Sequence, residues 1–321
     1  MTGPLVAGID AGGTKVLGVA LDPDDPTTVV DEARVPTPDG TVPVLDAIAD
    51  VVRTLGKDQE IGSVGVGIAG LVDRRGVLRV GPNLPGLFGV RVGDELEARL
   101  GLPIRVDNDA TCATWGEHVA GAARGVRDAV LVALGTGIGS GAIVEGELVR
   151  GAHGFGGEAG HMVVDPNGPP CPCGRQGCWE RFASGSGLGL LGREAAMANR
   201  FSRGVELAGE PELVRGEHVS RAAAEGDADA LAIFDHFADW VALGIGNLLA
   251  ILDSSLVVIG GGLVEAGDLL LHPVRRALPD RMMAPEERAD VRVVAAELGE
   301  RAGAIGAALL GAREASQLAS G

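Results

Sequence analysis

The sequence predicts an α/β protein with two domains, and three observations support this prediction. Its 321 residues suffice for two domains that each bury a hydrophobic core. Short apolar segments with the character of strands alternate with longer helical segments. A strand, a glycine-rich turn and a second strand occur twice, near residue 10 and near residue 136. We expect the two turns to face each other across a cleft and to hold one polyanion between them.

The first half of the chain is predicted to begin with an antiparallel meander and to continue as alternating strands and helices. The meander strands are Leu5–Asp10, Val16–Leu21 and Val29–Val35. The elements expected after it are a helix from about Val42 to Leu55, a strand over Val64–Ile68, a short strand over Pro103–Val106 and a helix over Ala110–Ala120.

The second half repeats the opening pattern and then becomes helical. In order, we expect a strand over Ala129–Leu134, a glycine-rich loop over Gly135–Gly141, a strand over Ala142–Val144, helices from Gly187 to about Leu252, a strand over Leu256–Ile259 and a C-terminal helix over Ala302–Glu314. The most apolar run, Val241–Val264, contains Asn247, Asp253 and several glycines. A buried helix followed by a buried strand explains this run better than a membrane span does.

The composition limits the possible partners. Hydrophobic residues make up 46% of the chain, so disorder is not expected. The chain has 44 acidic and 27 basic residues and a net charge of −17, which argues against binding to nucleic acid or to an anionic membrane. The N-terminal residues lack the basic start and apolar run of a secretory signal. We therefore expect a cytoplasmic protein that binds a small molecule.

Three of the four cysteines lie within eight residues, as Cys171, Cys173 and Cys178, and His161 precedes them by ten residues. Thiolate and imidazole are ligands that suit Zn²⁺, and four protein ligands leave no open position for substrate, so the predicted zinc is structural. The alternative is a group of free or redox-active thiols. The remaining cysteine, Cys112, is expected to be a small buried side chain.

The turn after the first strand, Asp10-Ala-Gly-Gly-Thr-Lys, has the features of a phosphate site. Glycines allow backbone N–H groups to approach phosphate oxygens, a threonine can donate a hydrogen bond, a lysine adds positive charge, and the aspartate could hold Mg²⁺ directly or through water. The alternative is an ordinary hairpin turn, and the spacing matches neither a Walker A motif nor a Rossmann fingerprint. The candidate residues are Asp10, Gly12, Gly13, Thr14 and Lys15.

Two further glycine-rich segments are candidates for nucleotide binding. The first contains Gly135, Thr136 and Gly137 and continues to Ser140 and Gly141, and its alternative is a β-turn in which backbones approach closely. The second, Gly260, Gly261 and Gly262, follows an apolar strand, where ligands bind in open α/β sheets. Its alternative is a tight turn between a strand and a helix.

The segment Asp107-Asn108-Asp109 ends a predicted strand and opens a helix, so one of its residues can act as the N-cap. Phosphoryl transfer to a hydroxyl requires a carboxylate beside the attacking O–H group. Spacing alone leaves both Asp107 and Asp109 open for that role.

Carboxylates and amides bind the hydroxyl groups of sugars well, and several candidates surround the cysteines. Glu158 and Glu180 flank the cysteine segment together with His161, and the alternative is solvated surface charge. Asn83 is a weaker candidate, because an asparagine beside proline and glycine is usual in turns.

These residues together resemble the ROK group of sugar kinases and sugar-responsive repressors, and most closely its bacterial glucokinases. The resemblance rests on an ordered set of motifs that spans most of the chain: Asp10–Lys15 and Leu134–Gly141 as phosphate motifs, Glu158–His161 as the sugar and metal motif, Cys171–Glu180 as the zinc signature, and Gly260–Gly262 as the turn beside adenosine.

The resemblance implies the actin/hexokinase-like fold, with residues 1–109 and 302–321 in a small domain and residues 110–301 in a large domain that carries the zinc loop. It implies Asp109 as the general base, and His161, Cys171, Cys173 and Cys178 as zinc ligands. It implies that the residues that bind the sugar are Asn83, Asn108, Asp109, Glu158, His161 and Glu180. The implied reaction is phosphorylation of glucose at its 6-hydroxyl by ATP with Mg²⁺.

Several alternatives remain within and beyond this family. The sugar could be another hexose or an N-acylated hexosamine such as N-acetylmannosamine, and polyphosphate could replace ATP. Repressors of the group carry a DNA-binding domain before the first phosphate motif, and because only nine residues precede Asp10, we expect none here. A non-catalytic sugar sensor is a further alternative. The family also leads us to expect a homodimer or homotetramer.

Overall fold

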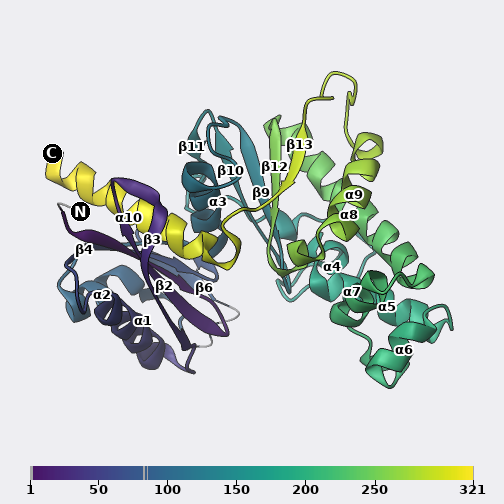
Figure 1. Ribbon diagram of the computed structural model, residues 1–321, viewed down its shortest axis with the longest axis horizontal. Helices are drawn as coiled ribbons and strands as arrows, with labels where there is room; N and C mark the ends of the chain where they lie inside the picture. The colour runs from purple at the N-terminus through teal and green to yellow at the C-terminus, as the bar shows by residue number, and fades with distance from the viewer. Residues whose placement is uncertain (1–2, 82–83, 85, 321) are drawn as a thin grey trace. The chain divides into compact units, whose positions relative to one another are not determined.

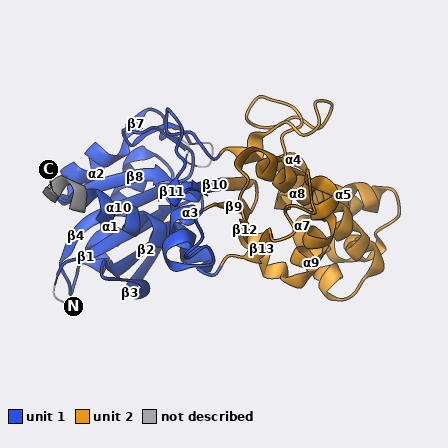
Figure 2. Cartoon of the chain, turned by 90° about the horizontal axis from the view of Figure 1, so that it is seen from above, with its two compact units in different colours: residues 1–127, 141–157, 297–321 blue, residues 128–140, 158–296 orange. Residues whose placement is uncertain are grey.

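The structure is a computed structural model that describes residues 3–81, 84 and 86–320, the last five as backbone only. It divides the chain into two compact units (Figure 2). The first unit contains residues 1–127, 141–157 and 297–321, and the second contains residues 128–140 and 158–296. This division differs from the predicted one at residue 109, because helix α3 (Asp109–Ala120) packs against the C-terminal helix α10 (Ala302–Ser320) and belongs to the first unit.

The first unit is built on a five-stranded sheet with the order β3-β2-β1-β4-β8. Figure 1 labels its strands β2, β3 and β4. Its strands are β1 (Leu5–Ala11), β2 (Lys15–Asp22), β3 (Asp25–Pro36), β4 (Ile61–Ile68) and β8 (Ile104–Asn108). The first three form the predicted antiparallel meander, whereas β1, β4 and β8 run parallel. The carboxyl ends of these three parallel strands therefore lie at one edge of the sheet.

Helices cover both faces of this sheet. Alternate residues of β1 point to opposite faces, so that Leu5 and Ile9 share one core with helix α1 (Thr41–Leu55), while Val6 shares another with α10. The approach of α10 is close, because a Cβ atom added at Gly65 in β4 would lie 1.7 Å from a backbone oxygen of α10.

The remaining elements of the first unit are short strands and one helix. Strands β5 (Leu71–Val72), β6 (Val77–Val80) and β7 (Val90–Arg91) form a small antiparallel sheet that leads into helix α2 (Val92–Leu100). Strand β10 (Ile138–Val144) begins in the second unit, and its end pairs with β11 (Glu147–Leu148) in the first. A 3₁₀ turn, Gly299–Arg301, precedes α10.

The second unit contains parallel strands in the order β9-β12-β13 and a helical region. The strands are β9 (Ala129–Leu134), β12 (Leu256–Gly260) and β13 (Arg292–Ala295). The α-helices are α4 (Glu180–Ala183), α5 (Gly185–Met197), α6 (Ser202–Ala208), α7 (Gly216–Ala224), α8 (Ala228–Leu252) and α9 (Asp268–Ala277). Short 3₁₀ turns cover Ala159–His161, Pro211–Leu213, Gly262–Ala266 and Leu278–Arg281.

One predicted boundary is wrong. The glycine-rich loop was expected to extend from Gly135 to Gly141, but β10 begins at Ile138, so the turn itself is limited to Gly135, Thr136 and Gly137. Gly141 is required in this strand because the strand packs closely on helix α3 there. A Cβ atom at Gly141 would lie 2.3 Å from the hydroxyl oxygen of Thr114. Across the described ranges, no helix combines the length and apolar character needed to span a bilayer.

Candidate active site and metal centre

Two acidic residues lie at the carboxyl edge of the parallel strands in the first unit. Asp10 is the penultimate residue of β1, and Asp109 begins α3 directly after β8. Burial raises the pKa of Asp10 to about 7, with the negative charge of Asp109 adding to the increase and Lys15 opposing it. Burial also raises the pKa of Asp109, against the lowering effect of hydrogen bonds that include the backbone N–H of Ala110. A carboxylate with a raised pKa is a suitable proton acceptor.

The surroundings of Asp107 and Asp109 separate their roles. The buried carboxylate of Asp107 lies 2.6 Å from Nε of Arg150 and 3.6 Å from Nη2 of Arg105. The carboxylate of Asp109 instead accepts hydrogen bonds at Oδ1 from Nδ2 of Asn108 at 2.9 Å and from the backbone N–H of Ala110 at 2.8 Å. Asp107 is therefore held in ion pairs, which leaves Asp109 as the better candidate for a base.

Asn108 orients Asp109 and starts helix α3. Its Oδ1 accepts a hydrogen bond from the backbone N–H of Thr111 at 2.9 Å, which is the N-cap interaction that the sequence allowed for Asp107 or Asn108. Its Nδ2 also donates to the backbone oxygen of Gly70 at 3.0 Å. The side chain thus ties the segment between β4 and β5 to the start of α3, beside Asp109.

The first glycine turn is a tight hairpin, closed by a hydrogen bond of 3.0 Å from the backbone N–H of Gly12 to the backbone oxygen of Lys15. Gly13 and Thr14 lie within this hairpin, between β1 and β2. The Lys15 ammonium group forms an ion pair with Glu300, which also binds Arg34. The negative charge of Glu300 therefore offsets the charge that Lys15 could offer to a phosphate while the pair is closed.

Helix α10 begins beside Asp10. A Cβ atom added at Gly303, in the first turn of α10, would lie 2.9 Å from the carboxylate of Asp10. Glycine at this position lets the helix N-terminus approach the carboxylate, and the partial positive charge of that terminus favours the ionised form.

In the second unit, two glycine turns lie together. Gly261 has φ of +77°, and a Cβ atom there would lie 2.5 Å from the backbone oxygen of Leu134, so only glycine fits between Gly260 and Gly262. The turn that follows Leu134 is hydrogen-bonded to the start of α5. Gly185 donates its backbone N–H to the oxygen of Gly135 at 2.8 Å, and the Ser186 hydroxyl donates to the oxygen of Thr136 at 2.8 Å.

Four predicted metal ligands gather in the second unit. One ligand atom from each residue lies within 4.8 Å of all the others, and the residues are His161, Cys171, Cys173 and Cys178. Sγ of Cys173 lies 3.5 Å from Sγ of Cys178, and Sγ of Cys171 lies 3.7 Å from Nδ1 of His161. Zinc–sulfur bonds of about 2.3 Å in a tetrahedron require ligand separations near 3.7 Å, so this set of donor atoms fits one Zn²⁺.

The candidate sugar-binding carboxylates surround this cluster. Oε1 of Glu180 lies 3.1 Å from Sγ of Cys171 and 3.6 Å from Nδ1 of His161. Oε2 of Glu158 lies 3.9 Å from Nε2 of His161, on the other side of the imidazole ring. A Cβ atom at Gly137 would lie 2.6 Å from Oε2 of Glu180, so the glycine turn and the metal cluster meet at this side chain. Asn83, the remaining sugar candidate, lies outside the described residues.

Sequence reasoning did not identify two residues that support these groups. Trp179 is fully buried, donates its Nε1–H to the backbone oxygen of Trp240 at 2.7 Å and packs on Gly244, so it anchors Cys178 and Glu180 to α8. Arg150 binds Asp107 from a segment 43 residues away. A large apolar side chain between a cysteine and a glutamate could have indicated the anchoring role of Trp179. No local pattern in the sequence indicates the role of Arg150.

Comparison with known proteins agrees with these observations. The sequence profile of the ROK family matches residues 6–314. The chain is 38% identical over 314 residues to a glucokinase from Streptomyces coelicolor, and the alignment covers 97% of this chain and 98% of that protein. It is 34% identical over 307 residues to an N-acetylmannosamine kinase from Citrobacter koseri, and the alignment covers 94% of this chain and 97% of that protein.

The fold is also that of a solved relative. A ROK family glucokinase from Streptomyces griseus, in complex with glucose and AMPPNP, superimposes with a TM-score of 0.85 at 36% identity, covering 96% of this chain and 99% of that one. The chain belongs to the ROK family. The predictions of the family and of the actin/hexokinase-like fold are confirmed.

Proposed function

We propose that this chain phosphorylates glucose at its 6-hydroxyl with ATP and Mg²⁺, and that Asp109 is the general base. The chain is an ATP-dependent sugar kinase by its family and by its similarity to glucokinases over almost its whole length. The observation that carries the finer proposal is the contrast between Asp107, which is held by Arg150, and Asp109, a half-buried carboxylate with a raised pKa and no ion pair among the described residues.

Asp109 would accept the proton of the sugar hydroxyl as that oxygen attacks the γ-phosphorus of ATP. Its orientation is supported by the hydrogen bond from Asn108, which limits rotation of the carboxylate. The backbone N–H groups of the glycine turns would stabilise charge on the phosphoryl oxygens, with Lys15 adding positive charge once it leaves Glu300. When bound, Mg²⁺ neutralises phosphate charge, and Asp10 would hold it directly or through water.

The proposed sugar contacts are the side chains around the metal cluster and beside the base. Asn108, Asp109, Glu158, His161 and Glu180 would bind ring hydroxyls, together with Asn83. The cluster would hold one structural Zn²⁺ and fix the segment that carries three of these side chains. This role is supported by Nδ1 of His161 lying on the cysteine side while Nε2 is directed away from it, toward Glu158.

The second candidate is a kinase for another hexose or for an N-acylated hexosamine, and the similarity to an N-acetylmannosamine kinase favours it as the alternative. Both candidates use the same base and the same metal cluster, so the shape of the sugar pocket distinguishes them. Polyphosphate as donor, a cytoplasmic location and a homo-oligomeric state stay predictions. A sensor without catalysis is disfavoured because it has no need of a base and of glycine turns that bind phosphate.

A panel of substrates tests the proposal. We expect kcat/KM with ATP to be higher for glucose than for mannose or N-acetylmannosamine by about tenfold or more, in an assay that couples ADP release to NADH oxidation. The same panel with polyphosphate identifies the donor. Higher kcat/KM for an N-acetyl sugar contradicts the glucose proposal. Tight binding of glucose without ATP turnover contradicts the kinase reaction itself and favours a sensor.

A further inference from the structure

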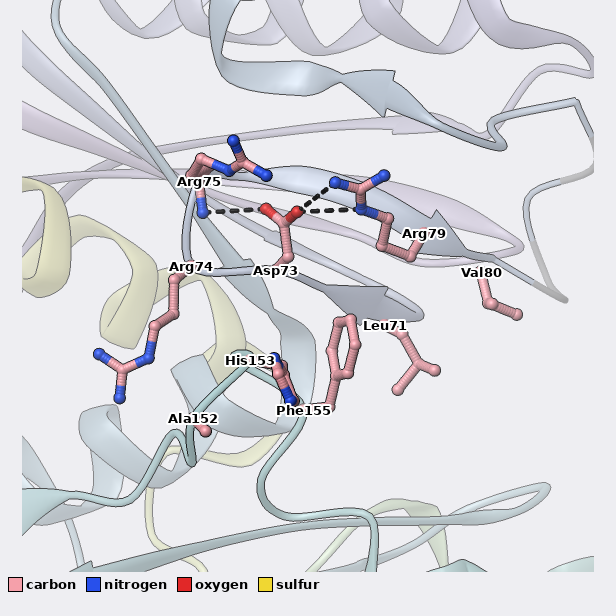
Figure 3. Close-up of a pocket in the computed structure, with 9 residues that line it drawn as sticks. All are labelled: Leu71, Asp73, Arg74, Arg75, Arg79, Val80, Ala152, His153 and Phe155. Atoms are coloured by element: carbon pink, nitrogen blue, oxygen red, sulfur yellow. Dashed lines mark hydrogen bonds and ion pairs between the residues drawn. The ribbon is translucent and has the colours of Figure 1, made fainter.

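A pocket lies wholly within the first unit and contains none of the candidate site residues discussed above. It has a volume of about 540 Å³, within the range of small-molecule sites. Strands β5 and β6 with the turn between them form one side, and the segment before Glu158 forms the other (Figure 3). Its lining residues are Leu71, Asp73, Arg74, Arg75, Arg79, Val80, Ala152, His153 and Phe155.

The charge of this pocket is opposite to that of the whole protein. Three arginines and a single carboxylate line it, whereas the chain carries a net charge of −17. Both oxygens of the Asp73 carboxylate already accept hydrogen bonds. Its Oδ2 accepts from Nε of Arg79 at 2.9 Å and from Nη2 at 2.7 Å, and its Oδ1 accepts the backbone N–H groups of Arg75 and Val77. These interactions outweigh burial and lower the pKa of Asp73, so the group stays ionised and offsets Arg79 alone.

Two arginines keep uncompensated charge. The Arg74 guanidinium donates through Nε and Nη2 to the backbone oxygen of Gly151, a neutral acceptor. The exposed Arg75 guanidinium has no carboxylate within ion-pair distance in the part of the chain that the structure describes. Figure 3 shows the Arg75 and Arg79 side chains on either side of Asp73, with Phe155 and His153 below it. Arg75 is therefore available to an anion.

The opposite part of the pocket is apolar and is held in place by a glycine. Phe155 is 37% exposed and Val80 is 44% exposed, and Leu71 lies beside them in Figure 3. Gly154 has φ of +94°, and a Cβ atom there would lie 2.8 Å from both the backbone nitrogen of Arg74 and the backbone oxygen of Val72. The loop therefore runs against the end of β5 and presents Phe155 next to the arginine-rich turn.

We propose that this pocket binds a phosphomonoester that has an apolar or ring-shaped portion. The Arg75 guanidinium binds the phosphate, Arg74 adds positive charge, and the ring lies on Phe155 and Val80. Guanidinium groups bind phosphate through two parallel N–H bonds, and an exposed aromatic ring that lines the same pocket suits a ligand with an anionic end and a flat body. The proposal does not depend on which sugar the kinase phosphorylates.

Calorimetric titration of the full chain tests this proposal, with phenyl phosphate, inorganic phosphate and phenol as probes at one ionic strength. Saturating glucose and a non-hydrolysable ATP analogue keep the probes out of the kinase site. We expect phenyl phosphate to bind more tightly than either fragment. Arg75→Gln should weaken its binding by about tenfold or more, and Phe155→Ala by roughly fivefold.

Arg124→Gln is the matched control, because Arg124 is another exposed arginine of the first unit and lies outside the pocket. It should leave the affinity for phenyl phosphate unchanged, and Phe155→Leu should retain more affinity than Phe155→Ala. Equal weakening by Arg75→Gln and Arg124→Gln would overturn the proposal, since binding would then follow overall charge. Failure of phenyl phosphate to bind up to about 10 mM would overturn it as well.

Discussion

Asp107 and Asp109 are two residues apart in the chain, and their neighbours give them different chemistry. Because Asp109 is the proposed base, Asp109→Asn should lower kcat by roughly 10²-fold or more while the protein stays folded. Asparagine has nearly the same shape as aspartate. Its amide oxygen can still accept the hydrogen bond from the Ala110 N–H group. Steady-state kinetics and a thermal melt of the same sample check this expectation. A folded variant with near wild-type kcat would falsify the assignment.

Asp107→Asn is the contrasting substitution. It removes one partner of a largely buried ion pair and leaves Arg150 without its carboxylate, which should lower the free energy of unfolding by about 3 kcal/mol. At a temperature where the variant is folded, kcat should fall much less than in Asp109→Asn. Urea unfolding and kinetics measured together separate the two effects. A large loss of kcat without any loss of stability would reverse the roles of the two aspartates.

Asp10 gives a prediction on pH dependence. Its pKa is about 7 in the folded protein and 3.8 for the unperturbed group, so between these values the folded state binds more protons than the unfolded state. This contribution therefore makes the metal-free protein less stable as pH rises through that window, by at most about 4 kcal/mol. Asp10→Asn should remove the effect, so its stability relative to wild type should increase from about pH 4 to about pH 8. Denaturant titrations in EDTA that give parallel pH profiles for both proteins would contradict this.

At the scale of the elements, patterns with strong local signals were predictable from the sequence. Strand β9 has the predicted bounds, and α3 begins one residue from the expected position. The start of β10 at Ile138 was not predictable, because glycines that loosen a free loop are also required where a strand packs closely on a helix. The binding of Asp107 by Arg150 was not predictable either, since it depends on contacts between residues distant in the chain.

The packing of α10 on α3 gives a prediction at this scale. A Cβ atom at Gly306 would lie 1.7 Å from the backbone oxygen of Cys112, which a side-chain rotation cannot relieve. Gly306→Ala should therefore lower the free energy of unfolding by about 3 kcal/mol, although alanine is the better helix former. Gly93→Ala in α2 is the matched control, because its Cβ atom would make only ordinary contacts, with a methyl group of Val106 at 3.7 Å and the backbone oxygen of Ile104 at 3.9 Å. The control should be neutral or slightly stabilising. Equal stabilities for the two variants in urea would show that α10 can shift away from α3.

At the scale of the whole molecule, the two units divide the proposed reaction between them. Asp10 and Asp109 belong to the first unit, while the metal cluster with Glu158 and Glu180 belongs to the second. Removal of the metal should therefore affect the second unit and sugar binding first, and leave the sheet of the first unit intact.

We expect about one zinc per chain, and chelation or Cys178→Ser should remove it. Because the cluster fixes the segment that carries His161 and Glu180, the loss of metal should raise KM for glucose more than it lowers kcat. Hydrogen exchange should accelerate within residues 158–182 and stay unchanged in β1 and β4. Cys112→Ala is the control, since Cys112 lies in the core of the first unit and should keep both the metal and the wild-type KM. A zinc-free protein with unchanged KM and unchanged exchange would mean that hydrogen bonds and Trp179 alone hold this segment in place.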